Sequence, residues 1–377
     1  MQWSVADQQF MQQALQLAQQ GRFTTAPNPN VGAVVVKDQQ VVGSGYHHQA
    51  GQPHAEVYAL QQAGILARGA TCYVTLEPCS HYGRTGPCAL ALVDAGVSRV
   101  VVAMLDPNPL VAGKGIALLQ NAGIDVQVGL YEQQARALNP GFLSRMERQR
   151  PWLKLKLACS LDGAIALANG ESQWLTGPEA RADVQLERAA CHAILSTATT
   201  VLQDQARLTV RAEAAQITPL SDGNVRQPVR IILDRQLKLT GQELLFQSGG
   251  PIWLIHSNQR KAPELTSSAA TDIQVRYLAV PEQDGQLDLN ALLALLAEQQ
   301  INDLWVEAGA RLASSLWQQQ LVDELIVYQA PVLLGAGAQP LLQLASLSRL
   351  IDAPRWQWQQ AQCLGPDVKL RACLQEP

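Results

Sequence analysis

The chain has 377 residues, more than one hydrophobic core usually organises, so we expect two domains. Hydrophobic residues make up 47% and charged residues 16%, the balance of an ordinary globular protein rather than a disordered one. The net charge is −4; residues 1–150 carry 10 Lys and Arg against 9 Asp and Glu, and the remainder 18 against 23. Neither half is basic enough to predict a nucleic-acid-binding surface.

The N-terminal stretch MQWSVADQQF lacks the basic start and apolar run of a signal peptide. No stretch of about 18 apolar residues follows, so we expect a cytoplasmic protein that makes no contact with membranes. The seven cysteines are odd in number and scattered along the chain. In a reducing compartment, paired cysteines indicate metal binding rather than a disulfide.

Helical and extended patterns alternate along the first 150 residues. Apolar residues at helical spacing predict a helix over residues 7–20, which Gly21 ends. Residues 31–38 and 40–47 predict a β-hairpin. The same reasoning predicts further helices near 54–67, 87–95, 115–122 and 132–146, and strands at 70–77, 99–104 and 125–130.

A polar stretch that ends in proline, residues 145–151, is the best candidate for a linker. The alternation then starts again, which predicts two α/β domains, 1–148 and 149–377. In the second domain we expect helices over 178–190 and 289–299, and extended segments at 152–163, 192–196, 229–234, 252–256, 303–309 and 323–334.

Residues 54–88 hold a set of side chains that suits a zinc ion. His54 and Glu56 lie at a predicted helix start after Pro53, while Cys79 follows a strand and Cys88 begins the next helix. Two neighbouring helix starts on one sheet edge can bring one imidazole and two thiolates together. Three protein ligands leave a fourth position for water, as in a catalytic zinc site. Glu56, two residues from the histidine, can then transfer protons.

Each of these features has an ordinary explanation when it occurs alone. His-x-Glu is most often a simple helix start, and two cysteines are more often buried than bound to metal. Their joint occurrence in this order favours zinc. The H-x-E…P-C-x-x-C signature belongs to zinc nucleobase deaminases, and this chain departs from it by having P-C-x8-C.

The segments PHAE, TLEPCSHYGRTGPC, PNPNVG and DPNPLVAGKG resemble the deaminase domain of the bifunctional riboflavin-biosynthesis deaminase/reductase family, across most of residues 5–146. The resemblance implies a cytidine-deaminase-like three-layer α/β/α fold. It implies one zinc ion per chain on His54, Cys79 and Cys88, with Glu56 as the catalytic proton shuttle. It also implies substrate contacts from Asn28, His47, His81, Arg84, Asp106 and Asn108. Both asparagines precede prolines and also fit ordinary turns.

Residues 151–377 contain no GxGxxG fingerprint. The glycine-rich stretch 335–340 lacks the βαβ unit of a dinucleotide site, so an ordinary loop is the better interpretation. WVEAGARLASSLW, residues 305–317, places a strand, a glycine turn and a helix start in the order that holds a phosphate on backbone N–H groups. Packing alone would account for Gly309 equally well.

Together with KLACSLDGAIALANGESQWLTG, HAILSTATTVLQDQARLTVR and VDELIVYQAPVLLG, this stretch resembles the reductase domain of the same family over nearly all of residues 151–370. The resemblance implies a dihydrofolate-reductase-like α/β fold that uses NADPH. The cofactor contacts that it implies are Ala158, Trp174, Thr200, Asp204, Gly309, Ala310, Arg311, Leu312, Ala313, Ser314 and Ser315. The implied contacts with a ribose-phosphate substrate are Ser172, Arg188, Leu208, Arg211 and Glu307. Arginine suits a sugar phosphate, although Arg188 also fits a solvated helix face.

The implied activity is hydrolytic deamination of 2,5-diamino-6-ribosylamino-4(3H)-pyrimidinone 5′-phosphate, followed by NADPH-dependent reduction of the ribosyl side chain to ribityl. We expect a homo-oligomer, a dimer. Two departures bear on NADPH preference: Gln205-Ala206 where the family has Asp-Pro, and Arg235 where it has a small hydroxyl residue.

Two other functions deserve comparison. A deaminase that acts on RNA would need a basic face, which the first half lacks. A single-function reductase with a zinc-stabilised binding module would need a fourth zinc ligand, and it would have no use for Glu56.

Overall fold

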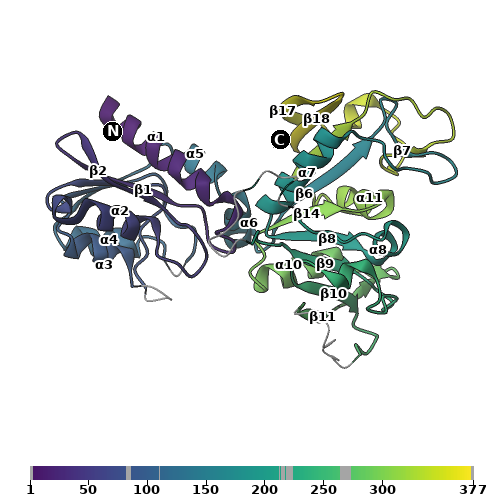
Figure 1. The fold of residues 1–377 in the computed structure, drawn as a ribbon, viewed down its shortest axis with the longest axis horizontal. Coiled ribbons are helices and arrows are strands. Elements are labelled where there is room, and N and C mark those ends of the chain that lie inside the picture. Colours follow the sequence, from purple (N-terminus) through teal and green to yellow (C-terminus); the bar gives the residue numbers. More distant parts are fainter. Residues whose placement is uncertain are drawn as a thin grey trace. The chain divides into compact units, whose positions relative to one another are not determined.

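The computed structural model describes residues 3–81, 86–109, 111–211, 213, 217, 224–263 and 273–374. The chain folds as two compact units, residues 1–150 and 151–377, which run from purple to blue and from teal to yellow in Figure 1. The division between Arg150 and Pro151 falls inside the polar stretch that the sequence marks as a linker.

The first unit is built on five strands: β1 (Gly32–Lys37), β2 (Gln40–Tyr46), β3 (Thr71–Val74), β4 (Arg99–Val102) and β5 (Asp125–Val128). They form one sheet in the order β2–β1–β3–β4–β5. β1 pairs antiparallel with β2 and β3, whereas β3, β4 and β5 run parallel. The carboxyl ends of the three parallel strands therefore share one edge of the sheet.

Helices cover both faces of this sheet, because successive strand side chains point to opposite sides. Val35 and Val100 belong to the core on one face, beneath α2 (Ala55–Ala63), α3 (Cys88–Asp94) and α4 (Lys114–Asn121). Val34 and Val101 belong to the other, with α1 (Val5–Gln19), α5 (Glu132–Ala137) and α6 (Pro140–Arg148). This is the three-layer α/β/α arrangement of Figure 1, and it confirms the expected fold class.

The single helix predicted over residues 132–146 is wrong, because α5 and α6 are separated by Leu138 and Asn139. Proline has no N–H to continue a helix, and Pro140 begins α6 instead. At the break, Asn139 accepts a hydrogen bond from the backbone N–H of Asn30 (2.7 Å) and donates one to its carbonyl (2.9 Å). The break thereby anchors the loop that contains Asn28.

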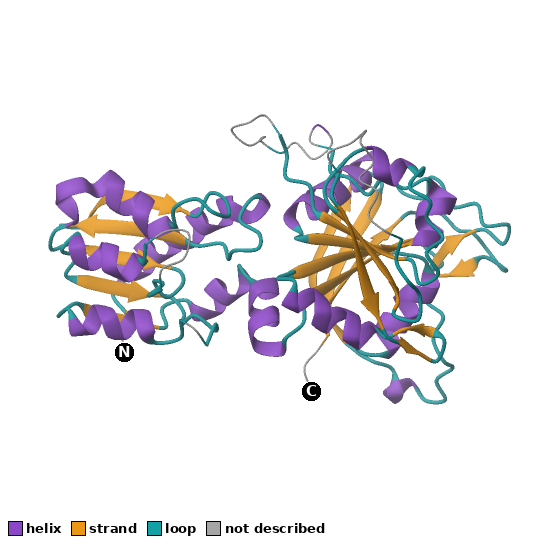
Figure 2. Cartoon of the chain, turned by 90° about the horizontal axis from the view of Figure 1, so that it is seen from below, coloured by secondary structure: helices purple, strands orange, loops and turns teal. Residues whose placement is uncertain are grey.

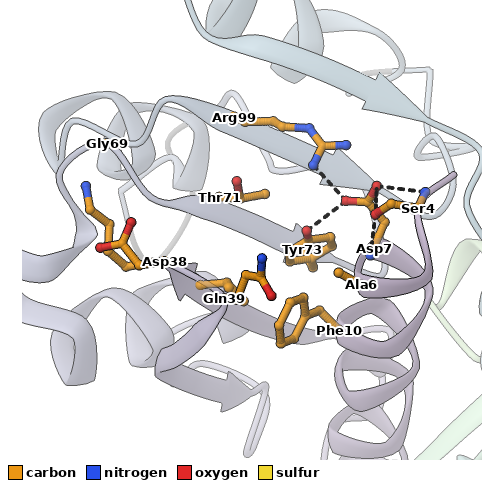
Figure 3. A pocket seen from close by; sticks show the side chains of 12 residues that line it. Ser4, Ala6, Asp7, Phe10, Asp38, Gln39, Gly69, Thr71, Tyr73 and Arg99 are labelled. Atoms are coloured by element: carbon orange, nitrogen blue, oxygen red, sulfur yellow. Dashed lines mark hydrogen bonds and ion pairs between the residues drawn. The ribbon is translucent and has the colours of Figure 1, made fainter.

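Asp7 ties the start of α1 to Tyr73 of β3 and to Arg99, the first residue of β4 (Figure 3). It forms a capping box with Ser4, and it accepts hydrogen bonds from Tyr73 (2.8 Å) and Arg99 (2.7 Å). Burial alone would raise the pKa of Asp7, but these donors hold it below its ordinary value. A pocket of about 280 Å³ opens beside this network, and no residue predicted for the functional site lines it.

The second unit contains a nine-stranded sheet in the order β11–β10–β9–β8–β14–β6–β15–β18–β17. Its strands are β6 (Trp152–Cys159), β8 (Ala193–Thr197), β9 (Val229–Leu233), β10 (Ile252–Ser257), β11 (Val275–Val280), β14 (Asp303–Glu307), β15 (Glu324–Gln329), β17 (Trp356–Leu364) and β18 (Asp367–Leu374). All pairs from β11 to β15 are parallel, and the β17–β18 hairpin is antiparallel. The sequence did not predict this hairpin. Two short ladders complete the unit: β7 (Ala164–Ala166) with β16 (Gln339–Pro340), and β12 (Glu282–Gln283) with β13 (Gln286–Leu287).

Helices lie on both sides of the larger sheet, as Figure 2 shows. The core on one face includes residues of α10 (Leu289–Glu298) and α11 (Ala310–Gln318), and the core on the other includes residues of α7 (Pro178–Ala190) and α8 (Ala198–Asp204). Because β8, β14 and β6 are parallel neighbours, the segments that follow them meet at one edge, where α/β proteins bind ligands. Over the described residues, no helix combines the length and apolar character needed to cross a membrane.

Candidate functional site: a His/Cys/Cys centre and a polar edge of the second sheet

Three potential metal ligands converge in the first unit, as the sequence predicts. His54 is the N-cap of α2, Cys88 is the first residue of α3, and Cys79 lies in the loop that follows β3. The Nδ1 atom of His54 is 3.6 Å from the Sγ atom of Cys79 and 3.3 Å from that of Cys88. All three ligand atoms lie within 4.8 Å of one another, and both cysteines are free thiols.

This donor set fits zinc. Donor atoms at 2.0–2.3 Å from a tetrahedral zinc ion lie about 3.5 Å apart, close to the two separations seen here. The side chain of Cys88, then that of His54, lowers the pKa of the Cys79 thiol to about 4 by hydrogen bonding, which favours the thiolate that binds metal. Across the described part of the chain the cluster has three members, so a zinc ion would keep one open position.

Glu56 lies in the first turn of α2 and is only 3% exposed. Burial raises the pKa of its carboxyl to about 7, although the charge of His54 opposes the shift. The carboxyl also hydrogen-bonds with the side chain of Cys88. A carboxyl with these properties, beside a water-binding metal position, is suited to transferring protons near neutral pH.

His47 and Asn28 form a second layer beside this centre. The Nδ1 atom of His47 lies 3.0 Å from the carbonyl oxygen of Pro53, so Nδ1 carries the hydrogen and donates it. The Nε2 atom is then free to accept from the Asn28 side-chain amide at 3.0 Å. Burial lowers the pKa of His47, which agrees with this neutral form. The His47 ring stands edge-on to the ring of His54, with centroids 5.3 Å apart.

Asp106 and Asn108 lie on the loop between β4 and α4. Burial raises the pKa of the Asp106 carboxyl to about 6, and the nearby charges of Glu77, His81 and Cys79 also act on it. Asp106 accepts a hydrogen bond from the backbone N–H of Asn108 at 2.8 Å. Of the remaining predicted substrate residues, His81 is exposed and Arg84 lies outside the described residues.

In the second unit, predicted residues meet at the carboxyl ends of the parallel strands. Ala158 lies near the end of β6, Glu307 ends β14, and Thr200 lies on α8 directly after β8. Asp204 is the exposed last residue of α8, and burial of part of its surface raises the pKa of its carboxyl. This edge of the sheet therefore brings together residues predicted to contact the cofactor and a residue predicted to contact the substrate.

Arg188 and Glu307 form a two-bonded ion pair across this edge. The Nε and Nη2 atoms of Arg188 donate to the two carboxylate oxygens at 2.5 and 2.8 Å, and Nη1 donates to the Thr209 carbonyl at 3.0 Å. Trp305 donates to the same carboxylate at 2.7 Å. Burial alone would raise the pKa of Glu307, but the charge of Arg188 lowers it to about 2. Arg188 is therefore not a solvated surface residue, and its guanidinium already has anionic and carbonyl partners.

The other predicted substrate residues differ in their accessibility. Ser172 and Trp174 are exposed in the loop before α7, where Arg181 lies 5.0 Å from the Trp174 ring. Arg211 is exposed, and its backbone N–H donates to Gln185 of α7 at 2.9 Å. Leu208 is buried, and its side chain belongs to the core beneath α7 and α8, so its backbone is the part that a ligand could contact.

The segment 309–315 forms a helix start, as the sequence predicts. Gly309 is the N-cap of α11, and a Cβ atom there would meet nothing within 4 Å, so this end is open. Ala313 and Ser314 are buried, and the Ser314 hydroxyl donates to the Ala310 carbonyl at 2.6 Å. The accessible part of the segment is therefore its first turn.

Lys156 is a residue that the sequence interpretation missed. It lies opposite Glu307 in the pairing of β6 with β14, and burial lowers the pKa of its ammonium group. The sequence predicts an extended segment over residues 152–163 and assigns Lys156 no role. A parallel sheet is covered on both faces, so a lysine in its central strand is itself a sign of a polar site.

Arg235, which replaces a small hydroxyl residue of the family, forms an ion pair with Glu282 at 3.2 Å. It follows the end of β9, one strand beyond β8 in the sheet. Its charge is therefore partly neutralised within the chain.

Known proteins resemble this chain along its whole length. The cytidine and deoxycytidylate deaminase zinc-binding region matches residues 4–104, and the RibD C-terminal domain matches residues 151–370. The riboflavin biosynthesis protein RibD of Escherichia coli K12 is 53% identical over 369 residues, covering 97% of this chain and 98% of that protein. The protein of the same name from Haemophilus influenzae is 50% identical over 373 residues, covering 98% of each.

Solved structures agree in fold. Acinetobacter baumannii RibD, form 2, superposes with a TM-score of 0.88 at 44% identity, covering 98% of this chain and 99% of that one. A diaminohydroxyphosphoribosylaminopyrimidine deaminase/5-amino-6-(5-phosphoribosylamino)uracil reductase from Thermotoga maritima has a TM-score of 0.81 at 31% identity, with the same coverage. The chain belongs to the RibD family of riboflavin biosynthesis proteins.

Proposed function

We propose that this chain catalyses two consecutive steps of riboflavin biosynthesis. The first is zinc-dependent hydrolytic deamination of 2,5-diamino-6-ribosylamino-4(3H)-pyrimidinone 5′-phosphate. The second is NADPH-dependent reduction of the ribosyl side chain to ribityl. The convergence of His54, Cys79 and Cys88 beside the buried Glu56, in a chain similar to RibD proteins over its whole length, carries the proposal.

In the first unit, His54, Cys79 and Cys88 would hold the metal. When bound, zinc supplies a Lewis acid that activates water at neutral pH. Glu56 accepts the proton of the attacking water and delivers it to the departing exocyclic nitrogen, which leaves as ammonia. The high pKa that burial gives Glu56 suits both halves of this transfer.

Substrate recognition in this unit falls to the polar residues around the centre. The Asn28 amide, which His47 orients, can form hydrogen bonds with the polar edge of a pyrimidine, and Asp106 and Asn108 can do the same. His81 and Arg84 would meet the more distant part of the substrate, and an arginine fork is suited to its phosphate.

In the second unit, NADPH would supply a hydride when bound. The first turn of α11, from Gly309, offers backbone N–H groups to a phosphate of the cofactor; Ala158, Trp174, Thr200 and Asp204 complete its predicted contacts. The ribose phosphate would lie against Ser172, Arg211, the Leu208 backbone and the Arg188–Glu307 pair. The pair keeps a carboxylate and a guanidinium in a fixed orientation at the strand ends.

We also infer that the enzyme is a cytoplasmic homodimer. All seven cysteines are free, as expected in a reducing compartment. β17 is an edge strand whose side chains are exposed on both faces, including Trp358 at 62%, and Leu350 and Ile351 nearby along the chain are 84% and 79% exposed. Open edges and exposed apolar side chains of this size are typical of a surface that a second copy covers. Sedimentation of the chain and of a Trp358→Glu variant tests this.

The decisive experiment incubates the purified chain with the diaminopyrimidinone phosphate, with and without NADPH. Ammonia should appear in both reactions, and NADPH should be oxidised only after deamination. Glu56→Gln keeps the size of the side chain and should retain zinc while ammonia release falls about 10²–10⁴-fold. Near-normal ammonia release by a zinc-loaded Glu56→Gln protein would contradict the role of Glu56.

A further inference from the structure

Glu77 is a buried carboxylate that the catalytic scheme above does not use. It follows β3, precedes Pro78 and Cys79, and is only 3% exposed. Its own N–H donates to the Met104 carbonyl at 3.0 Å, so its backbone is fixed to the end of β4. Its carboxylate accepts backbone N–H hydrogen bonds at 3.2, 3.0, 3.0 and 3.3 Å, from Asp106, Gly113, Gly115 and Ile116 respectively.

These donors lie at both ends of one loop. Asp106 begins the segment that connects β4 to α4, and Gly113 is the N-cap of α4. Between them the segment contains Asn108, so the loop holds two of the proposed substrate contacts. Glu77 therefore joins the two ends of this loop by hydrogen bonds. It belongs to the same chain segment as Cys79, so it also links the loop to the ligand cluster.

Glu77 also replaces the missing cap of α4. The N-cap of this helix is Gly113, which has no side chain to accept the first free N–H groups. Glu77 accepts the N–H groups of the second and third helical residues, Gly115 and Ile116, as an N-cap side chain normally would. Its negative charge at the helix N-terminus is favourable as well.

The close approach depends on a glycine. A Cβ atom on Gly115 would lie 1.9 Å from the Pro78 carbonyl oxygen, so any side chain there would push α4 away from the strand end. Glu77 thus supplies the carboxylate, and the absence of a side chain at Gly115 allows the start of α4 to approach it closely enough to form hydrogen bonds.

We propose that Glu77 is a positioning residue for deamination, which holds the loop of Asp106 and Asn108 in register with the His54/Cys79/Cys88 centre. It acts through the loop and touches neither substrate nor metal, since its carboxylate oxygens accept from backbone N–H groups and it is absent from the ligand cluster found over the described residues. The inference rests on the proposed deaminase function.

The test compares Glu77→Gln with the unchanged enzyme in steady-state deamination of the diaminopyrimidinone phosphate. Glutamine has the same size, but its NH₂ group faces two backbone donors, so the loop should loosen. We expect kcat/KM to fall about 10–100-fold, mainly through KM, with one zinc per chain and unchanged reduction of the deaminated product. Amides of Gly113, Gly115 and Ile116 should exchange faster with solvent.

Gly115→Ala is the second variant, because it displaces the same helix start while leaving the carboxylate in place. It should reproduce the rise in KM. The control is Asp7→Asn, which alters another buried carboxylate, one that accepts hydrogen bonds from Tyr73 and Arg99 (Figure 3), and it should leave the deaminase KM unchanged.

Unchanged kcat/KM in Glu77→Gln would overturn the inference. So would loss of zinc in step with activity, or a fall in kcat at constant KM, since these would place Glu77 in the metal centre or in the chemical step. If Glu77→Gln does not fold, an unaltered KM in Gly115→Ala has the same force. Failure of the proposed function looks different, because the unchanged chain would then release no ammonia.

Discussion

Removing one partner of the Arg188–Glu307 pair should destabilise the second unit more than removing both. In Glu307→Gln, the buried guanidinium of Arg188 loses its counter-charge, and Arg188→Met likewise leaves a buried carboxylate. The side chains are only 15% and 14% exposed, so neither orphaned charge is well hydrated. Breaking a buried pair in this way costs about 3–5 kcal/mol.

The contacts that remain in each variant determine how much it loses in free energy of unfolding. In Glu307→Gln, the guanidinium keeps its bond to the Thr209 carbonyl and Trp305 keeps an acceptor, so the cost should be about 3 kcal/mol. In Arg188→Met, nearby Lys156 offers the carboxylate some compensation. The double variant removes both charges, and its cost should fall short of the sum of the single ones by about 2 kcal/mol or more.

Hydrogen exchange of peptides from β6 and β14 measures the free energy of opening of this unit. Deaminase activity serves as the internal control, because the first unit has its own core. The matched control is Asp352→Asn, which breaks the exposed Arg349–Asp352 pair of the same unit and should change nothing measurable. Additive effects of the two single variants, or a Glu307→Gln chain as stable as the original, would refute the reasoning.

Three further predictions follow from the site and the fold. Cys88→Ala should lose most of its zinc by elemental analysis, and full zinc retention would mean that the ligands are wrongly assigned. Residues 151–377 expressed alone should reduce the deaminated substrate with NADPH; a folded, NADPH-binding fragment without turnover would show that the two domains are not independent. Asp7 has a folded-state pKa below its unfolded value of about 3.8, so its stabilisation is complete above pH 4–5 and is lost as the pH falls through the folded pKa. Amide exchange of β3, corrected for intrinsic rates, measures the difference in stability between Asp7→Asn and the original chain. This difference should be constant above pH 5 and shrink below about pH 4. A difference that grows toward low pH would contradict the assignment.

The metal centre could be found from the sequence because each ligand occupies a locally defined position. A proline before His54 and another before Cys88 mark two helix starts, and the neighbouring strands of a predicted α/β sheet bring such starts together. The residue types then decide the metal. The alternation of helices and strands likewise predicted two α/β units, because periodicity depends only on nearby residues.

Contacts between distant segments could not be predicted in this way. The four donors to Glu77 are 29 to 39 residues away along the chain, and their approach depends on how α4 packs against the end of β3. Arg188 and Glu307 are separated by 119 residues, so their charges could be assigned to a site but not to each other. β17 was missed because this glutamine-rich edge strand has no buried face to reveal a period.

The sequence by itself thus determined which chemistry the chain carries, since ligand types, helix starts and periodicity are local properties. Only the tertiary structure decided how that chemistry is held. The hydrogen bonds from Asp106 to Glu77 and from Arg188 to Glu307 join segments that are distant along the chain, and strand pairing places Lys156 opposite Glu307. No local pattern in the sequence encodes the distance or direction of these contacts.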